Sequence, residues 1–578
     1  MKNYKYKVLL LLCVIAFAFG CGKKYEPFPV DRNTIEFVFD KGDSAGTKAQ
    51  AFLLGTYRIL KTGHNRVDGN YLDAASDDAV TSTEATNQVT QLATGSYTAA
   101  NFPNEENSWA YYYTGIRRAN IFINNIAVVP TNIREGNGLL QKQNWKSEAR
   151  FLRSFFYFEL LKRYGGVPLL GDKVYNIDDD VALPRKSFEE CVNYIVSECD
   201  GIKDSLLIIK TGSTSHRITR AAALALKSRV LLFAASKLYN NNETPNTNPL
   251  LGYTNYDANR WKLAMDAASE ALNDTQSARA LLPDFRNVFI TVNNSELIFI
   301  RTNTSQNGTS DKVESANAPI GFPAPPGRGI TSPTQELVES YPMKNGLPIT
   351  DPLSGYLASN PYANRDPRLD STIFYNGAIW LGLPVETYEG GRSKPNGTQI
   401  QTRTSYYMRK FMGRFRNAPT YSTHIDDWVL FRYAEIYLNY AEAANEFSGP
   451  NTANVKDAIR ALRLRAGITQ STPGVSGAFG IRSNISSTEE MREIIRNERR
   501  IEMAFEESRF FDIRRWKIAE VVMNQPRTGL SIVPVGTTYE YNRITALQTT
   551  FDKNRMYYYP IPYLEVLKNP NMVQNPGW

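Results

Sequence analysis

Histidine and cysteine are scarce in this chain of 578 residues, which contains three histidines and four cysteines. The histidines (His64, His216 and His424) are far apart, and none stands at a useful spacing from a second typical metal ligand. A zinc-type site needs three or four such ligands brought together. The sequence therefore predicts no metal site, and it shows no motif for a cofactor.

Two of the cysteines, Cys191 and Cys199, lie eight residues apart in a segment that is predicted to be helical. Eight residues of helix rise about 12 Å. The Cα atoms of a disulfide lie within about 7 Å of each other. We therefore expect two buried free thiols and a fold that needs no disulfide.

Motifs that accompany catalysis or nucleotide binding are also missing. The chain has no G-x-x-x-x-G-K-[ST] loop, no G-x-S-x-G turn, no H-E-x-x-H and no paired C-x-x-C. Its 66 Lys and Arg against 58 Asp and Glu give a formal net charge of +8, with no Lys/Arg-rich run. Such a run is the usual mark of phosphate binding. We therefore predict that the protein is not an enzyme and binds no nucleic acid.

The N-terminus has a distinct pattern. Lys2, Lys5 and Lys7 precede an apolar run at residues 8–19, and Gly20 and Cys21 follow. The run is shorter than the roughly 20 residues that span a bilayer, but its basic start and small-residue exit are typical of an export signal. A Cys directly after the small residue resembles the bacterial lipoprotein signal, so we expect removal of residues 1–20 and a lipid on Cys21. An ordinary secretory signal with a chance cysteine is the alternative.

Amphipathic helices dominate the rest of the chain. Apolar residues that recur at i, i+3, i+4 and i+7 predict helices over residues 145–164, 219–238, 260–272, 428–447, 454–466 and 487–505. Trp261-x-x-Ala264 followed by Ala268 resembles a tetratricopeptide helix pair, although no clean repeat period is present. We predict a mainly α fold with degenerate helix pairs and long polar loops at residues 62–107, 303–334 and 347–419.

Two charged segments allow more than one interpretation. Asp77 and Asp78 are adjacent carboxylates in a polar stretch. They fit a solvated turn best, ahead of an acid pair for glycoside cleavage or contacts to an ion or to sugar hydroxyls. Residues 498–515 alternate acidic and basic side chains, which favours ion pairs within and between helices over an anion site.

A series of short motifs, taken in order, resembles the SusD/RagB family of outer-membrane lipoproteins. The series is Trp109-x-x-Tyr112-Tyr113, Glu148-Ala149-Arg150, Tyr164-Gly165-Gly166, Arg217-Ile218-Thr219-Arg220, Arg365-Asp366-Pro367-Arg368, Arg432-Tyr433-Ala434-Glu435, Glu498-Arg499-Arg500, Arg515-Trp516 and Gln574-Asn575-Pro576-Gly577-Trp578. Each motif is weak evidence alone. The resemblance rests on all of them occurring in the family's order between Trp109 and the last residue. The expected lipid on Cys21 agrees with it.

The resemblance implies a right-handed helical scaffold of degenerate tetratricopeptide-like pairs. It implies one SusD-like domain over residues 21–578, with an N-terminal part at about 31–300 and a C-terminal part at about 301–578. It also implies a lipid-anchored protein on the outer face of the outer membrane. Such a protein would bind oligosaccharides and deliver them to a SusC-like TonB-dependent transporter. Peptide capture for a RagA-like transporter, a surface hydrolase and a purely structural repeat adaptor are the alternatives.

The long loops hold the residues that we expect to contact a ligand. Sugar sites commonly combine aromatic faces with planar polar groups. The candidates in these loops are Asp77, Asp78, Tyr97, Asn101, Trp380 and Tyr388.

Overall fold

The computed structural model describes residues 34–578 except 84–86, 177, 180, 209–215, 304–311, 324–325, 396–400, 423, 425 and 453. The expected signal sequence and Cys21 therefore lie outside the described residues. Among those that are described, no helix combines the length and apolar character needed to cross a membrane.

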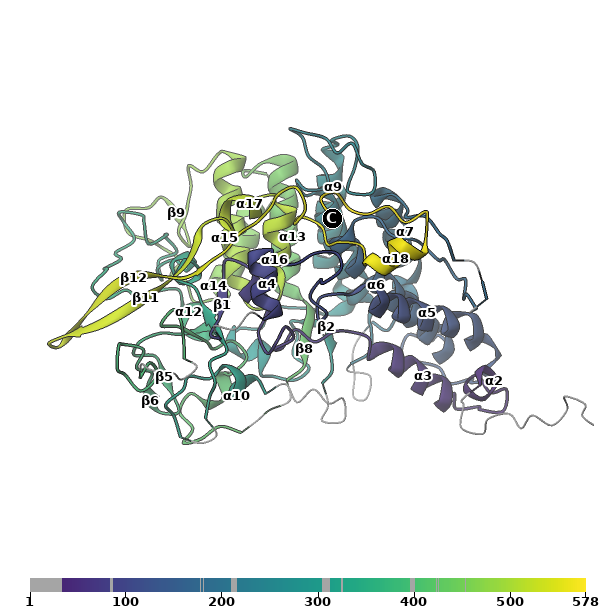
Figure 1. Ribbon diagram of the computed structural model, residues 1–578, viewed down its shortest axis with the longest axis horizontal. Helices are drawn as coiled ribbons and strands as arrows, with labels where there is room; N and C mark the ends of the chain where they lie inside the picture. Colours follow the sequence, from purple (N-terminus) through teal and green to yellow (C-terminus); the bar gives the residue numbers. More distant parts are fainter. Residues whose placement is uncertain are drawn as a thin grey trace, which may run out of the picture.

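Long helices stack side by side through the centre of the molecule (Figure 1). α5 (Trp109–Asn125), α6 (Gln141–Tyr164), α7 (Phe188–Ile202), α8 (Arg220–Ala235) and α9 (Asn259–Leu272) follow one another, and each packs against the next. α13 (Tyr433–Ser448) extends the row by packing on α8 and α9, and α14 (Val455–Arg465) and α15 (Thr488–Glu502) pack on α13. α3 (Thr47–Tyr57) covers α5 and α6 at the other end. The predicted mainly α fold of stacked helix pairs is confirmed.

The sequence of α6 shows how local chemistry sets these helices. Phe151, Phe155 and Phe158 repeat at helical spacing and are all buried. The helix ends at Gly165, whose φ of +76° is costly for any residue with a side chain. A Cβ at this position would also lie 2.4 Å from the carbonyl oxygen of Leu250. Both the backbone conformation and the lack of space therefore require glycine here. α7 begins with a capping box in which Ser187 and Glu190 satisfy each other's backbone N–H groups.

Two of the predicted helices have different bounds in the structure. Residues 428–432 form strand β8 (Trp428–Arg432), which pairs with β2 (Leu297–Arg301), and the helix begins only at Tyr433. The run of charged residues at 498–515 is interrupted, because Phe505 and Glu507 adopt positive φ angles. α15 therefore ends at Glu502, and α16 (Ser508–Arg515) starts a separate helix. The other four predicted helices agree with the structure to within a few residues.

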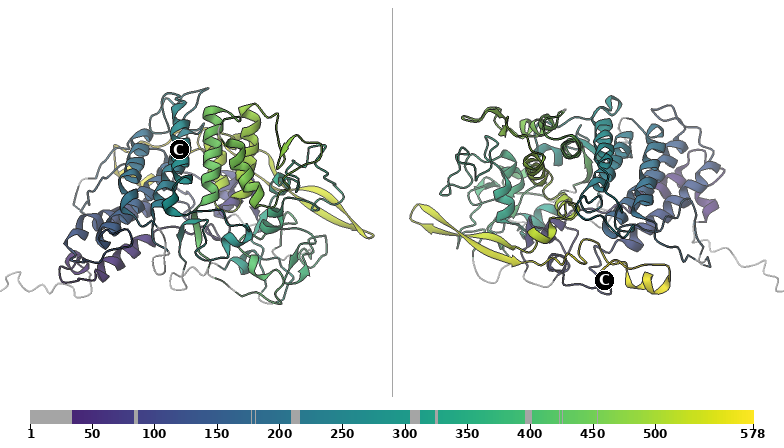
Figure 2. Two further views of the ribbon diagram at one scale, coloured as in Figure 1. Left: turned by 180° about the vertical axis from the view of Figure 1, so that it is seen from behind. Right: turned by 90° about the horizontal axis from the view of Figure 1, so that it is seen from above.

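Short helices and two-stranded sheets occupy the segments between and beside the long helices. The strand pairs are β1 (Ala79–Thr81) with β3 (Thr331–Pro333), β4 (Ile373–Phe374) with β7 (Tyr407–Met408), β5 (Ile379–Trp380) with β6 (Leu383–Pro384), β9 (Gly477–Ala478) with β10 (Ile481–Arg482), and β11 (Pro526–Val535) with β12 (Thr538–Gln548). The short helices are α2 (Ile35–Val38), α4 (Gln88–Thr94), α10 (Val313–Asn317), α11 (Gln335–Ser340), α12 (Pro367–Thr372), α17 (Ala519–Val522) and α18 (Tyr563–Lys568). The β11–β12 hairpin projects from the loop-rich end of the molecule, opposite α2 and α3 (Figures 1 and 2).

One hydrophobic core runs through both parts of the chain, from Phe39 to Met572. Cys191 and Cys199 are buried in it as free thiols, as predicted. Burial in apolar surroundings raises the pKa of the Cys191 thiol to about 12, so this thiol stays protonated and unreactive at neutral pH.

Candidate ligand-binding groove

A groove lined by tyrosines lies at the loop-rich end, beside the projecting hairpin. It is open to solvent and has a volume of about 610 Å³. Its walls come from residues 359–363, residues 375–388 around β5 and β6, and residues 537–541 at the tip of β12. We call it the tyrosine groove, after Tyr362, Tyr375, Tyr388, Tyr539 and Tyr541.

The five tyrosine rings form an unbroken series. Tyr375 stacks on Tyr362 with ring centroids 4.4 Å apart, and Tyr362 meets Tyr541 edge-on at 6.1 Å. Tyr541 lies 6.4 Å from Tyr539, which in turn stacks on Tyr388 at 5.5 Å. All these separations are within the range of favourable aromatic contacts. The groove therefore presents one continuous aromatic surface.

The hairpin places two of these rings. Tyr539 and Tyr541 alternate along β12 and so point to the same face of the hairpin. They pair across the strands with Pro534 and Ile532 of β11. β11 and β12 form a two-stranded sheet with no further strand beside it. The position of the two rings is therefore set by the contacts that hold the base of the hairpin.

The base of the hairpin is fixed to the body by backbone contacts. The N–H of Leu530 donates to the carbonyl of Thr404 (3.0 Å), and the N–H of Glu389 donates to the carbonyl of Ile532 (2.8 Å). The close approach to Thr404 depends on Gly529, since a Cβ there would lie 2.3 Å from the Thr404 Cα. The position of the tyrosines thus depends on one glycine in β11.

Polar groups accompany the rings. The side-chain carbonyl of Asn376 accepts a hydrogen bond from the N–H of Thr387 (3.0 Å). The carboxylate of Glu386 accepts from the Arg392 guanidinium (2.8 Å), and this contact lowers the pKa of Glu386. The remaining polar residues of the lining are Ser359, Asn360, Thr537 and Thr538. The groove offers aromatic faces with amide and hydroxyl groups beside them.

Two of the six predicted ligand residues belong to this region. Tyr388 lines the groove itself. Trp380 lies in β5 but is fully buried, and its ring packs edge-on against Phe374 (5.3 Å) and Phe415 (6.2 Å). Trp380 therefore supports the groove from within and presents no face to a ligand in this conformation.

The prediction of a solvated turn at Asp77 and Asp78 is wrong. Both carboxylates are buried. Asp77 accepts a bidentate pair of hydrogen bonds from Arg509 (2.8 and 2.7 Å), and Asp78 pairs with Arg500 (2.6 Å). Burial tends to raise the pKa of Asp77, but the two arginines outweigh it and lower this pKa. These aspartates hold the segment before β1 against α15 and α16, and they do not line the tyrosine groove.

Tyr97 and Asn101 do not line the groove. The Tyr97 ring is buried and stacks on the ring of Trp578, with centroids 5.2 Å apart. Asn101 is exposed, and its side-chain carbonyl accepts from the backbone N–H (2.5 Å) and the hydroxyl (2.7 Å) of Thr98. A ligand role for Asn101 stays a prediction.

Sequence reasoning missed four tyrosines of the groove, Tyr362, Tyr375, Tyr539 and Tyr541. One signal was present: Tyr539-x-Tyr541 follows a Gly-Thr-Thr turn and alternates as a strand does. That pattern predicts that both rings lie on one face of a strand. It does not predict which other segment of the chain they face.

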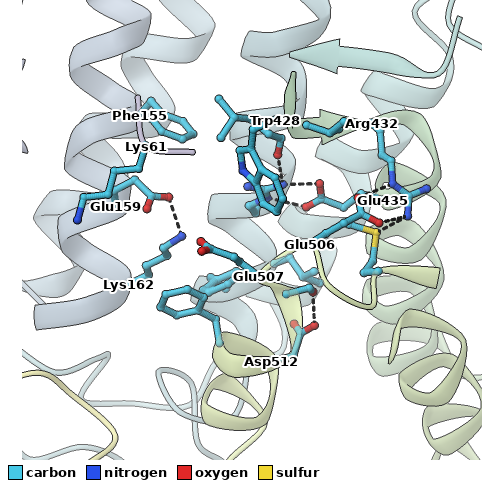
Figure 3. A pocket seen from close by; sticks show the side chains of 18 of the residues that line it. Lys61, Phe155, Glu159, Lys162, Trp428, Arg432, Glu435, Glu506, Glu507 and Asp512 are labelled. Carbon is cyan, nitrogen blue, oxygen red and sulfur yellow. Dashed lines mark hydrogen bonds and ion pairs between the residues drawn. The ribbon is translucent and has the colours of Figure 1, made fainter. Parts of the chain in front are cut away.

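A second cavity of about 80 Å³ lies between α6, the start of α13 and the connection from α15 to α16 (Figure 3). Its walls are charged, and burial lowers the pKa of Lys162 to about 8 and that of Lys61 to about 7. Most of its charged groups have ion-pair partners: Glu159 with Lys162 and Arg163, Arg66 with Glu507, Arg229 with Glu435, Arg432 with Glu506, and Asp512 with Arg515. Lys61 instead donates to the carbonyl of Glu105 (2.9 Å) and the hydroxyl of Ser108 (3.0 Å). A ligand would have to replace these partners, so the tyrosine groove is the better candidate.

No cluster of three or more His, Cys, Asp or Glu side chains that could hold a metal ion occurs within the described ranges.

Comparison with known proteins identifies this architecture. The stacked helix pairs and the groove define a helical-repeat scaffold that carries its candidate ligand site on loops and a hairpin. The SusD family model matches residues 295–578, and a second model, described as starch-binding associating with outer membrane, matches residues 42–232. The chain belongs to the SusD/RagB family.

Relatives and solved structures agree with the family models. SusD-like protein P38 of Formosa agariphila is 25% identical over 438 residues, which are 73% of this chain and 74% of the relative. A SusD-like protein of Bacteroides fragilis superposes with a TM-score of 0.74 at 25% identity, over 93% of this chain and 98% of the other. A SusD-like carbohydrate binding protein of the same species gives a TM-score of 0.71 at 25% identity, over 91% and 99%.

Proposed function

We propose that this protein binds glycans in the tyrosine groove and delivers them to a partner SusC-like TonB-dependent transporter in the outer membrane. The unbroken series of five tyrosine rings is the main support. The C–H faces of sugar rings stack on aromatic rings, while hydroxyl and amide groups beside them bind the sugar hydroxyls. Asn360, Asn376 and the threonines of the hairpin tip supply such groups.

The starch-binding description of one matching family model and the carbohydrate-binding relative from B. fragilis favour glycans as the ligand class. Peptide capture is the alternative. Peptide recognition commonly uses an open strand edge or a backbone-lined groove. The groove observed here is walled mainly by side chains with aromatic faces, which favours sugars.

Tyr539→Ala should weaken glycan binding about tenfold. Tyr539 is 37% exposed, so its ring is available to a ligand, and its loss removes one stacked face from the series. One such ring contributes about 1.5 kcal/mol, and 1.4 kcal/mol corresponds to a factor of ten. Isothermal titration calorimetry on a panel of soluble polysaccharides and peptides measures the change.

The matched control is Tyr563→Ala. Tyr563 is 54% exposed and lies on α18, outside the groove, so its removal should leave the affinity unchanged. Equal affinity in both variants would remove the groove from the proposal. Binding of peptides together with no affinity for any glycan would favour the alternative, and product release from a bound glycan would show a hydrolase.

Lipid anchorage is the second part of the proposal, and Cys21 is its attachment point. Cys21→Ala removes the only side chain that the expected lipoprotein signal would acylate. We expect the variant to move from the membrane fraction to the soluble fraction on cell fractionation, because it lacks the thiol that would carry the lipid. Membrane association that persists in the variant would contradict the anchor.

A further inference from the structure

We infer that the tyrosine groove selects neutral glycans over anionic ones, an inference that rests on the proposed function. The described residues that line the groove include no lysine and no arginine. Their one carboxylate is Glu386. The only charged side chain of the described lining is therefore a carboxylate, and it is paired with Arg392.

Cations close to the groove already have partners within the protein. Arg365 donates to the backbone carbonyls of Pro361 (2.8 Å), Val338 (2.6 Å) and Tyr341 (2.7 Å). Arg392 donates to Glu386 (2.8 Å), and Lys394 donates to Glu389 (2.8 Å). Lys394 is also held by the hydroxyl of Ser405 (3.0 Å). Arg392 and Lys394 would each have to share or give up a carboxylate partner to bind an incoming anion.

The hairpin carries one further cation. Arg543 lies on the same face of the hairpin as Tyr541 and is turned toward α11, where it pairs with Glu336 (3.3 Å) and Glu339. It also donates to the hydroxyl of Thr528 (2.9 Å). With this contact, every basic side chain identified around the groove is engaged.

Anionic sugars need what this wall lacks. Carboxylate and sulfate groups are bound best by free arginines that donate two parallel hydrogen bonds. Partial burial of such an anion without a cation is unfavourable, and a neighbouring carboxylate adds repulsion. The hydrogen bonds from Arg392 lower the pKa of Glu386, which keeps this carboxylate charged at neutral pH.

Neutral sugars match the same wall. Their hydroxyls both donate and accept hydrogen bonds, as do the amides of Asn360 and Asn376 and the hydroxyls of Thr537 and Thr538. The tyrosine rings add uncharged faces. The chemistry of the lining therefore fits a neutral polymer without any rearrangement of ion pairs.

The test uses matched polymers that differ only in charge. Laminarin, starch, mannan and xylan are each titrated beside their sulfated derivatives by calorimetry at low and high salt. At least one neutral polymer should bind, and its affinity should not depend on the salt concentration. We expect the sulfated form of that polymer to bind at least tenfold more weakly. The discrimination should narrow as salt rises, because screening weakens repulsion by the carboxylates.

Glu386→Gln provides the matching variant. The substitution removes the one carboxylate of the lining and releases Arg392 from its partner. The ratio of neutral to sulfated affinity should fall several-fold, and binding of the sulfated polymer should become salt-dependent. A ratio that does not move would contradict the role of the Glu386–Arg392 pair.

The outcomes separate the two proposals. A sulfated polymer that binds as tightly as its neutral form, with Tyr539→Ala weakening both, overturns the selectivity while glycan binding in the groove stands. If no polymer of either kind binds, the proposed function fails, and the selectivity fails with it.

Discussion

Glu502→Gln should lower the free energy of unfolding by about 3–5 kcal/mol, the largest single loss that we expect from a polar residue of this chain. Glu502 is the last residue of α15 and is fully buried. Its carboxylate pairs with Arg368 (2.8 Å), Arg432 (2.7 Å) and Arg465. Removing the charge leaves three buried guanidinium groups short of a partner, and an uncompensated buried charge is strongly destabilising.

The position of the Glu502 carboxylate explains why its loss should destabilise the whole fold and not α15 alone. Arg368 lies in α12, Arg432 ends β8 and Arg465 ends α14, so one side chain joins three elements to α15. Burial would raise the pKa of Glu502, but the three arginines outweigh it and hold this pKa well below its usual range. A lowered pKa in the folded state contributes stability above the unfolded value and loses it as the pH falls. The difference between parent and variant should therefore shrink progressively below about pH 4.5.

Glu493→Gln is the control on the same helix. The Glu493 side chain is 74% exposed and faces Arg496 at 3.4 Å, a surface pair worth little. We expect a change of less than about 0.5 kcal/mol in urea unfolding followed by circular dichroism. Equal midpoints for the two variants would show that the buried cluster does not stabilise the fold as argued.

Much of the scaffold could be predicted because helical periodicity is a local signal. The aromatic face of α6 and the glycine that ends it are both visible within one stretch of sequence. Strand β8 was missed for the opposite reason. Its apolar residues fit a helix equally well, and its partner β2 lies far away in the chain. Only the completed fold decides between the two.

The groove was harder to predict because residues 537–541 of the hairpin complete a wall that residues 359–388 begin. Tyr388 was expected from its loop, but Tyr539 and Tyr541 gain their role only when β12 lies beside residues 359–388. Asp77 and Asp78 were placed in an exposed turn for the same reason, because their partners are distant in the sequence. Their partners Arg500 and Arg509 follow more than 400 residues later, so an internal ion-pair cluster resembled an exposed turn.

Gly529→Ala should weaken glycan binding about 100-fold, more than the loss of either hairpin tyrosine alone. An added Cβ would lie 2.3 Å from the Thr404 Cα and 2.9 Å from its carbonyl carbon, so β11 must move away from the body. That shift breaks the hydrogen bond from Leu530 to Thr404 and carries both Tyr539 and Tyr541 out of the aromatic series. Two rings at about 1.5 kcal/mol each correspond to about two powers of ten.

Calorimetry with the polysaccharide that binds the parent protein measures this loss, and thermal unfolding reports whether the rest of the fold survives. Overpacking at one contact costs typically 1–3 kcal/mol, so the variant should remain folded with a lower midpoint. Gly136→Ala is the matched control, because a Cβ there meets no atom within 4 Å and the residue lies in an exposed turn. If Gly529→Ala binds like the parent, the hairpin does not position the tyrosines. If it binds weakly while keeping its helical signal, the anchoring of β11 to residues 404–405 is what aligns the aromatic wall.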